Sequence, residues 1–190
     1  EGAPAIDLTT LSPIQVDDTY DFWRETNVFE QKQKGYYGVA LKIPLGDLSS
    51  DTARKLIPIV QSYAADDIRI TVNQGLVLRY VREAVLPHLY TELKQIGLAE
   101  PGFDSLADIT ACPGTDTCNL AVSNSTHLSL ELEQVIKEDY KHLIANSHLK
   151  IKISGCMNAC GQHMAANIGL HGRSIKHKDL VVPAMQIVLG

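Results

Sequence analysis

Residues 154–163 read SGCMNACGQH, and residues 111–118 read ACPGTDTC. These two stretches hold all four cysteines of the chain, spaced as Cys112-x5-Cys118 and Cys156-x3-Cys160 with 37 residues between the pairs. Two close pairs with a long gap require a fold that brings two loops together. A chain of 190 residues buries enough surface to need no disulfide or metal for its core, so the cysteines call for a chemical explanation.

Spacing alone leaves three explanations for these cysteines: an iron–sulfur cluster, a tetrahedral zinc site, or unrelated thiols. Structural zinc sites usually leave two to four residues between paired ligands, so the five-residue gap favours iron–sulfur. The glycines and the proline beside the cysteines let backbone N–H groups approach the sulfur atoms and disperse thiolate charge. The composition is not that of a disulfide-rich secreted scaffold.

The overall composition excludes several classes of protein. The chain is 45% hydrophobic and 21% charged, with a net charge of -5, which is typical of a globular protein and leaves no strongly basic face for nucleic acid. No apolar run is long enough for a membrane span, and no secretory signal is present, so we expect a cytoplasmic protein with reduced thiols. Residues 149–190 carry a net charge of +4, which indicates a solvated surface or a nearby anionic ligand.

Hydrophobic periodicity predicts an α+β unit over residues 35–100. The pattern predicts a strand (37–43), a helix capped by Ser50 with Pro58 causing a kink or an early end, a hairpin (68–72 with 76–81) and a helix (83–96). The apolar face expected for the first helix comprises Ala53, Leu56, Ile57, Val60 and Ala64. Strand, helix, hairpin and helix in this order predict a ferredoxin-like fold.

The remaining segments predict an arm and a second unit. Residues 1–30 are acidic and aperiodic, so we expect an extended arm or linker anchored by Phe22 and Trp23, followed by domains at 31–104 and 105–190. In the second domain the pattern predicts a loop (101–111), a helix (119–146) and strands (149–153 and 184–189). The packing set expected for that helix is Leu120, Leu128, Leu130, Leu132, Val135, Ile136, Leu143 and Ile144.

The double cysteine motif resembles the signature of the sirohaem and iron–sulfur nitrite and sulfite reductases. In that family the last pair occurs as Thr/Ser-Gly-Cys-x-Asn-x-Cys-Gly, which SGCMNACG matches. Residues 68–76, IRITVNQGL, resemble the family's hairpin that reaches the macrocycle, and residues 166–172, ANIGLHG, resemble the strand after the second pair. The resemblance covers about residues 30–190 and implies a ferredoxin-like half-domain followed by a truncated nitrite/sulfite reductase 4Fe-4S (sirohaem-binding) domain.

The resemblance also implies cofactors and site residues. Cys112, Cys118, Cys156 and Cys160 would bind a [4Fe–4S] cluster, and Cys160 would also reach the sirohaem iron. Because sirohaem carries many carboxylates, its site needs cations and hydrogen-bond donors. The predicted contacts are Arg69, Thr71, Asn73, Gln74, Asn158, Gln162 and His163.

The family reaction is a six-electron reduction of nitrite or sulfite that uses ferredoxin or a reductase subunit as electron donor. The sequence matches only the C-terminal half of such enzymes, so we expect a fragment that is inactive alone and lacks the substrate-gripping N-terminal half. A homodimer could substitute for that half through an apolar face. The alternative is a non-catalytic module that holds structural zinc or a simple iron–sulfur electron carrier.

Overall fold

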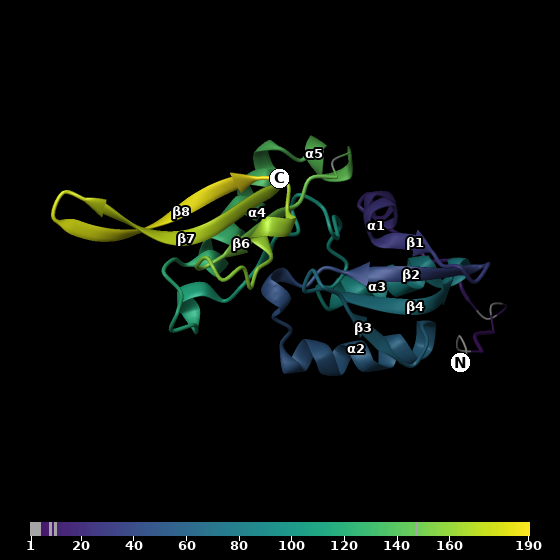
Figure 1. Ribbon diagram of the computed structural model, residues 1–190. Helices are drawn as coiled ribbons and strands as arrows, with labels where there is room; N and C mark the ends of the chain where they lie inside the picture. Colours follow the sequence, from purple (N-terminus) through teal and green to yellow (C-terminus); the bar gives the residue numbers. More distant parts are fainter. Residues whose placement is uncertain (1–4, 8, 10, 147) are drawn as a thin grey trace. The chain divides into compact units, whose positions relative to one another are not determined.

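The structure is a computed structural model that describes residues 5–7, 9, 11–146 and 148–190. The chain divides into two compact units, Glu1–Phe103 and Asp104–Gly190. Each unit has its own four-stranded sheet (Figure 1).

The sheet of the first unit is antiparallel throughout. Its strands lie in the order β1-β2-β4-β3, with β2 at the centre paired to β1 and β4. The bounds are β1 (Val28–Glu30), β2 (Tyr36–Leu41), β3 (Ile68–Ile70) and β4 (Leu76–Arg82). The predicted hairpin is therefore present, with β3 and β4 as its arms.

Among the described residues of the first unit, three helices complete it, namely α1 (Tyr20–Asn27), α2 (Ser50–Tyr63) and α3 (Leu86–Gln95), with short 3-10 turns η2 (Pro44–Gly46) and η3 (Glu83–Val85). The core joins side chains of all three helices to the sheet, and Trp23 of α1 lies 5.0 Å from the Tyr90 ring of α3, centroid to centroid. The expectation of an extended arm is wrong for residues 20–30, which form α1 and β1, because Tyr20 and Trp23 bury their rings in this core. Residues 1–4, 8 and 10 of that arm lie outside the described residues.

Helix α2 begins one residue earlier than the sequence indicates. Its N-cap is Ser49, whose hydroxyl accepts a hydrogen bond from the Thr52 backbone N–H at 3.1 Å, and Ser50 is the first helical residue. Pro58 lies inside the helix, which continues to Tyr63, so the predicted early end is wrong. The buried face consists of Leu56, Ile59, Val60 and the C-cap Ala64, whereas Ile57 is 53% exposed.

We expect Ser49→Ala to lower the free energy of unfolding by about 1 kcal/mol. The substitution removes the hydroxyl oxygen that accepts the hydrogen bond from the Thr52 N–H in the first turn of the helix. Ser50→Ala is the matched control and should change stability by only a few tenths of that amount. Urea unfolding followed by circular dichroism measures both. Equal losses for the two variants would contradict the assignment of the cap.

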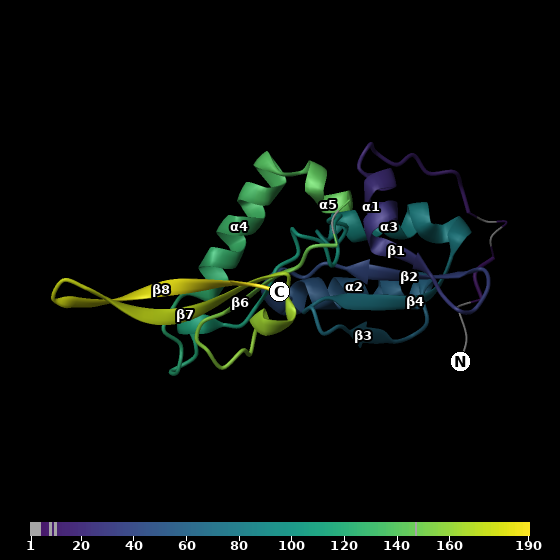
Figure 2. The same cartoon turned by 45° about the horizontal axis from the view of Figure 1, so that its top comes forward.

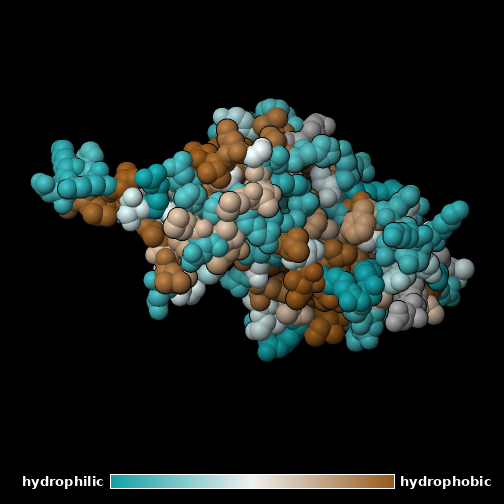
Figure 3. Space-filling view, in the orientation of Figure 1, coloured by the Kyte–Doolittle hydropathy of each residue, from teal (hydrophilic) through white to brown (hydrophobic). Residues whose placement is uncertain are grey.

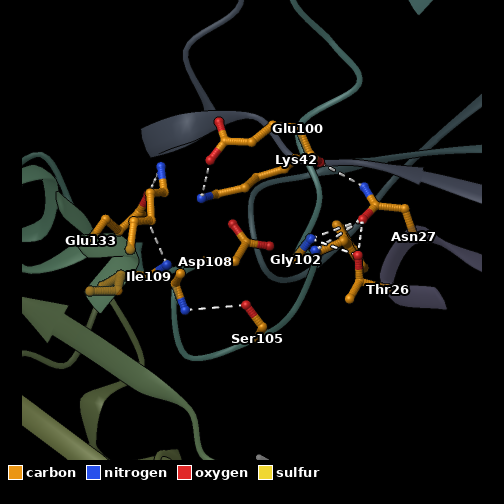
Figure 4. A network of polar contacts seen from close by, with 12 residues as sticks. Thr26, Asn27, Lys42, Glu100, Gly102, Ser105, Asp108, Ile109 and Glu133 are labelled. Carbon is orange, nitrogen blue, oxygen red and sulfur yellow. Dashed lines mark hydrogen bonds and ion pairs between the residues drawn. The ribbon is translucent and has the colours of Figure 1, made fainter. Parts of the chain in front are cut away.

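The end of α1 is fixed to the segment after α3 by one buried amide (Figure 4). The Asn27 Nδ2 group donates to the carbonyl oxygens of Ala40 and Glu100, both at 3.0 Å, and its Oδ1 accepts from the Gly102 backbone N–H at 3.1 Å. Its side chain thus ties strand β2 to the chain that leaves the first unit.

We expect Asn27→Ala to destabilise the first unit by about 3 kcal/mol, because several buried backbone groups lose their partner at once. Glu25→Ala, an exposed change in the same helix, serves as control and should be close to neutral. Thermal melts of both variants test this. A loss below 1 kcal/mol for Asn27→Ala would show that water replaces the amide.

The second unit has a mixed sheet in the order β5-β6-β7-β8. Strands β5, β6 and β7 are parallel neighbours, and β7 and β8 form a long antiparallel hairpin that extends beyond the rest of the unit (Figures 1 and 2). The bounds are β5 (Thr110–Ala111), β6 (Ile151–Ser154), β7 (Ile168–His177) and β8 (Leu180–Leu189), with helices α4 (Ser125–Asp139) and α5 (His142–Asn146) and 3-10 turns η4 (Gly114–Asp116) and η5 (His163–Ala165).

The helix predicted over 119–146 is two helices, and its packing face differs from the expected one. The side chain of Asn124 caps α4 by accepting from the His127 N–H at 3.0 Å, so residues 119–124 lie before the helix, and Leu120 among them is exposed. Leu130 and Val135 are exposed as well. The buried face is Ser125, Ser129, Glu133 and Ile136, and the Glu133 carboxylate accepts from the Ile109 N–H at 3.0 Å (Figure 4).

Apolar side chains gather on the surface over α2 and β3, whereas the tip of the β7–β8 hairpin is hydrophilic (Figure 3). Ile70 and Val72 are 83% and 75% exposed. The first unit therefore presents an apolar edge of the kind expected where a partner domain packs. Among the helices in the described part of the chain, none is long and apolar enough to cross a bilayer.

Candidate functional site

The two cysteine stretches meet because their strands are parallel neighbours. Strand β5 pairs with β6 through Thr110 opposite Lys152 and Ala111 opposite Ile153. Cys112 directly follows β5, and Cys156 follows β6 after a single glycine. Because parallel strands end at the same edge of a sheet, the first cysteine of each pair lies at one edge.

Hydrogen bonds join the two loops directly at Cys112. Its sulfur accepts from the Gly155 backbone N–H at 3.1 Å, and its own N–H donates to the Ile153 carbonyl at 3.1 Å. The Ser125 hydroxyl donates to the Cys112 carbonyl at 2.7 Å and thereby fixes the same residue from α4. The expectation that a glycine N–H approaches a cysteine sulfur is confirmed, and the contact runs from one pair to the other. Such a donor stabilises the thiolate form that binds iron.

Two glycines permit this close approach of the loops. A Cβ atom on Gly161 would lie 1.9 Å from the Ile153 carbonyl oxygen, and one on Gly172 would lie 2.0 Å from the Gly155 carbonyl oxygen. Any larger residue at either position would push backbone away from the cysteines.

The other cysteines lie in tight turns. The Cys118 N–H donates to the Gly114 carbonyl at 3.0 Å, which closes a turn around residues 114–118. Cys160 is exposed and lies between Ala159 and Gln162, both of which have the left-handed φ of 59°. Left-handed residues other than glycine are costly and gather at functional sites, so this loop is held in a demanding conformation by its surroundings.

All four cysteines are free thiols. Across residues 5–7, 9, 11–146 and 148–190, no three histidine, cysteine, aspartate or glutamate side chains are arranged to hold a metal ion. The structure brings the two loops together. That the four sulfur atoms converge to bind one cluster stays a prediction.

Gln162 is held by a buried lysine. The Lys152 ammonium, on β6, donates to the Gln162 side-chain carbonyl at 2.8 Å. This contact leaves the amide nitrogen of Gln162 as the group that would donate to a carboxylate. Burial of the ammonium lowers the pKa of Lys152 from its ordinary value.

His163 points inward and is almost completely buried. Its Nδ1 lies 2.9 Å from the Ser154 hydroxyl, which also accepts from the Gly161 N–H at 3.1 Å, and its ring lies 4.8 Å from that of His171, centroid to centroid. Burial, and secondarily the neighbouring His171, lowers the pKa of His163. The imidazole is therefore neutral near pH 7.

Asn158 is exposed beside Cys156 and Met157, and these three residues line a cavity of about 380 Å³ together with residues 171–174 in the middle of β7. In a largely apolar cavity, a small number of polar groups fix the orientation of the ligand. Its predicted cofactor contact stays a prediction.

The predicted contacts of the first unit lie on and after β3. Arg69 is exposed and its guanidinium lies 3.1 Å from the Asp67 carboxylate. The Thr71 N–H donates to the Gly75 carbonyl at 2.9 Å, and its hydroxyl accepts from the Gly75 N–H at 3.0 Å. The local role of Thr71 is to close the hairpin turn.

Asn73 and Gln74 form the tip of that turn and are half-buried. Gln74 has a left-handed φ of 64°, and its side-chain amide donates to the Leu45 carbonyl at 3.3 Å. The turn is thus built by local contacts that leave Arg69 as its exposed cation.

Three residues that support the cysteine loops were missed in the sequence: Ser125, Lys152 and Ser154. Ser154 hydrogen-bonds both Gly161 and His163, and Ser125 holds Cys112. The position of Ser154 directly before Gly-Cys was an available signal for its role. Nothing in the periodicity distinguishes a buried Lys152 from the exposed face of a strand, because the pairing of β6 on both sides decides its burial.

Two family models match the chain in succession. Residues 29–96 match the nitrite/sulfite reductase ferredoxin-like half domain, and residues 102–188 match the nitrite and sulphite reductase 4Fe-4S domain. The chain therefore belongs to the nitrite and sulfite reductase family. This confirms the fold class and the family that the cysteine motif indicated.

The similar curated proteins include plant and cyanobacterial enzymes. The chain is 28% identical to the ferredoxin–nitrite reductase of Synechococcus elongatus over 100% of its own length, and 30% identical to the chloroplastic ferredoxin–nitrite reductase of Zea mays over 92%. It spans 35% and 31% of those relatives, respectively.

Among solved structures, the NirA protein of Mycobacterium tuberculosis matches 86% of this chain with a TM-score of 0.71 and 26% identity. The matched region is 30% of the NirA chain. The architecture described above is therefore one found within a larger protein.

Proposed function

We propose that this chain supplies the iron–sulfur and sirohaem half-site of an enzyme that reduces nitrite by six electrons. The observation that carries the proposal is the hydrogen bond from the Gly155 N–H to the Cys112 sulfur, which links the two cysteine loops. Nitrite is favoured over sulfite as substrate, and ferredoxin as donor, because the relatives named above are ferredoxin–nitrite reductases.

The donor set fits a [4Fe–4S] cluster, which supplies one-electron transfer when bound. Four free thiols without a competing disulfide match its ligand number, and a backbone N–H already points at one of them. In this proposal Cys112, Cys118, Cys156 and Cys160 hold the cluster. Cys160, which is exposed, would also bind the sirohaem iron through its sulfur.

The proposed sirohaem contacts divide into donors and positioning groups. Arg69, Asn158 and the amide nitrogen of Gln162 would donate to the carboxylates of the macrocycle, and Lys152 orients Gln162 for this. Thr71, Asn73 and Gln74 shape the hairpin that presents Arg69. His163, whose Nδ1 is engaged by Ser154, would contribute only its other ring nitrogen.

Anaerobic reconstitution with iron, sulfide and sirohaem tests this proposal. The expected result is an absorption band in the red from the reduced-porphyrin macrocycle together with cluster absorption. Stoichiometric zinc, or a cluster without macrocycle binding, would support the alternative of a structural zinc site or simple electron carrier.

We also propose that turnover needs a second half-domain, which the N-terminal half of a larger enzyme or a second copy of this chain would provide. The exposed Ile70 and Val72 of the first unit support this, since they form an apolar edge on its surface. Light scattering over a wide concentration range should reveal dimers. Nitrite reduction by the strict monomer with an artificial donor would refute this part of the proposal.

A further inference from the structure

A second cavity in the Asp104–Gly190 unit has an unusual lining of soft donor atoms. Its volume is about 380 Å³, and Met157, His163, Met164 and His171 all face it, with an aliphatic remainder. The two thioethers come from the second cysteine loop and the turn η5, and the imidazoles come from η5 and strand β7. None of the four proposed cluster cysteines lines this cavity.

Each imidazole has an oxygen atom close to its Nδ1, as is common for metal-ligating histidines. Nδ1 of His171 lies 3.4 Å from the Gly172 carbonyl oxygen, which can only accept, so a weak N–H contact there leaves Nε2 with the lone pair. Nδ1 of His163 lies 2.9 Å from the Ser154 hydroxyl, which allows the same tautomer. An oxygen partner on one ring nitrogen fixes the ring and leaves the other nitrogen to bind metal.

The separation of the rings also suits a shared ion. Their centroids are 4.8 Å apart with an angle of 33° between the planes. Two imidazoles that bind one ion at about 2.0 Å have centroids roughly 5 Å apart when their bonds to the ion meet near the tetrahedral angle. The centroid separation is therefore compatible with two rings that share one ion.

The methionines decide which metal fits. Met157 and Met164 are 76% and 80% exposed at the cavity, although burial of such side chains is favourable. Thioethers are soft ligands that select Cu(I), whereas zinc prefers thiolate, imidazole and carboxylate. In the described part of the chain, no third histidine, cysteine, aspartate or glutamate side chain joins these histidines to hold a metal ion. Unbranched methionine side chains are flexible enough to close on an ion.

We propose that His163, His171, Met157 and Met164 bind one Cu(I) ion in this cavity. The site uses imidazole and thioether donors and none of the four proposed cluster cysteines, but it shares His163 with the proposed sirohaem contacts, so copper and sirohaem would compete for that ring nitrogen. Copper held here would be a stable monovalent ion, and its binding requires no electron transfer.

Magnetic resonance of the whole chain tests the proposal directly. The protein carries isotope-labelled histidine rings and methionine methyl groups and receives Cu(I) without air, in excess over its four thiols. We expect shifts of the ring nitrogens of His163 and His171 and of the methyl groups of Met157 and Met164. Ag(I), a diamagnetic surrogate with a magnetic nucleus, should split those ring-nitrogen signals. Met185 and the other five histidines are internal controls.

Substitutions of the methionines and of His171 test whether these four side chains bind copper or only pack against one another. Met157→Leu and Met164→Leu preserve volume and should each weaken Cu(I) binding at the histidines about tenfold, whereas Met185→Leu should not. Because His163 is buried, its replacement could unfold the protein. His171→Ala is therefore used to remove one imidazole ligand, and it should also weaken Cu(I) binding. Metal signals confined to the cysteines, or unchanged binding in the double methionine variant, would overturn the proposal. Zinc at equal excess should leave the methionine methyl signals in place.

Discussion

Cys112→Ser is expected to abolish the iron–sulfur chromophore of the anaerobically reconstituted chain and to reduce bound iron from about four atoms per chain to near zero. Cys112 is the cysteine that receives a hydrogen bond from the other cysteine loop, so its loss removes both a ligand and the contact that joins the loops. Serine is nearly isosteric, and its hydroxyl is not deprotonated near neutral pH. Iron analysis and absorption spectra measure the effect.

Met157→Leu is the matched control for this prediction. It changes a sulfur-containing residue within the Cys156–Cys160 loop without touching a predicted ligand of the iron–sulfur cluster, and its side chain is exposed, so the cluster should form normally. A cluster that survives Cys112→Ser with all four irons would contradict the ligand assignment. Loss of the cluster in both variants would mean that any change in the cysteine loops prevents cluster formation, so that the loss in Cys112→Ser would not identify Cys112 as a ligand.

Gly161→Ala should be among the most destabilising single changes in the second unit. The new methyl group would lie 1.9 Å from the Ile153 carbonyl oxygen and 3.1 Å from the Cys112 nitrogen, and these are backbone atoms that cannot move aside independently. The hydrogen bond between Cys112 and Ile153 would break as the strands separate. We expect a loss of about 3 kcal/mol or more, with poor cluster incorporation.

Gly97→Ala provides the comparison for backbone strain alone. Gly97 has a φ of +75° and no atom within 4 Å of a built Cβ, so alanine there should cost only about 1 kcal/mol. Chemical unfolding monitored by circular dichroism compares the two. Equal costs would mean that β6 and the cysteine loop shift without penalty.

Much of the first unit follows from local sequence signals. Alternating apolar residues predict β2, and the Asn-Gln-Gly turn predicts the β3–β4 hairpin. Gly97 predicts the end of α3, and the structure agrees on all three points. The exceptions are places where distant contacts decide. Residues 20–30 have weak periodicity, yet they form α1 and β1 because Trp23 fills the core beneath Tyr90.

The second unit depends more on pairing between segments that are distant in the chain. Helix α4 buries Ser129 and Glu133 and exposes Leu130, the reverse of what hydrophobicity predicts, because the Glu133 carboxylate caps the backbone N–H of Ile109 before β5. The length of β7 depends on β8, which pairs with it along all of its residues. Such pairing leaves little trace in a single strand.

The sequence by itself determined the family: Cys-x5-Cys followed by Ser-Gly-Cys-x-Asn-x-Cys-Gly indicates the nitrite and sulfite reductases, and the two family models confirm it. Only the tertiary structure decided how the loops meet and what surrounds them. The parallel pairing of β5 with β6 places Gly155 against Cys112, and the approach of β7 places His171 against His163. The physical reason is that ligand type is a property of single residues, whereas distances between loops are set by the strands that carry them.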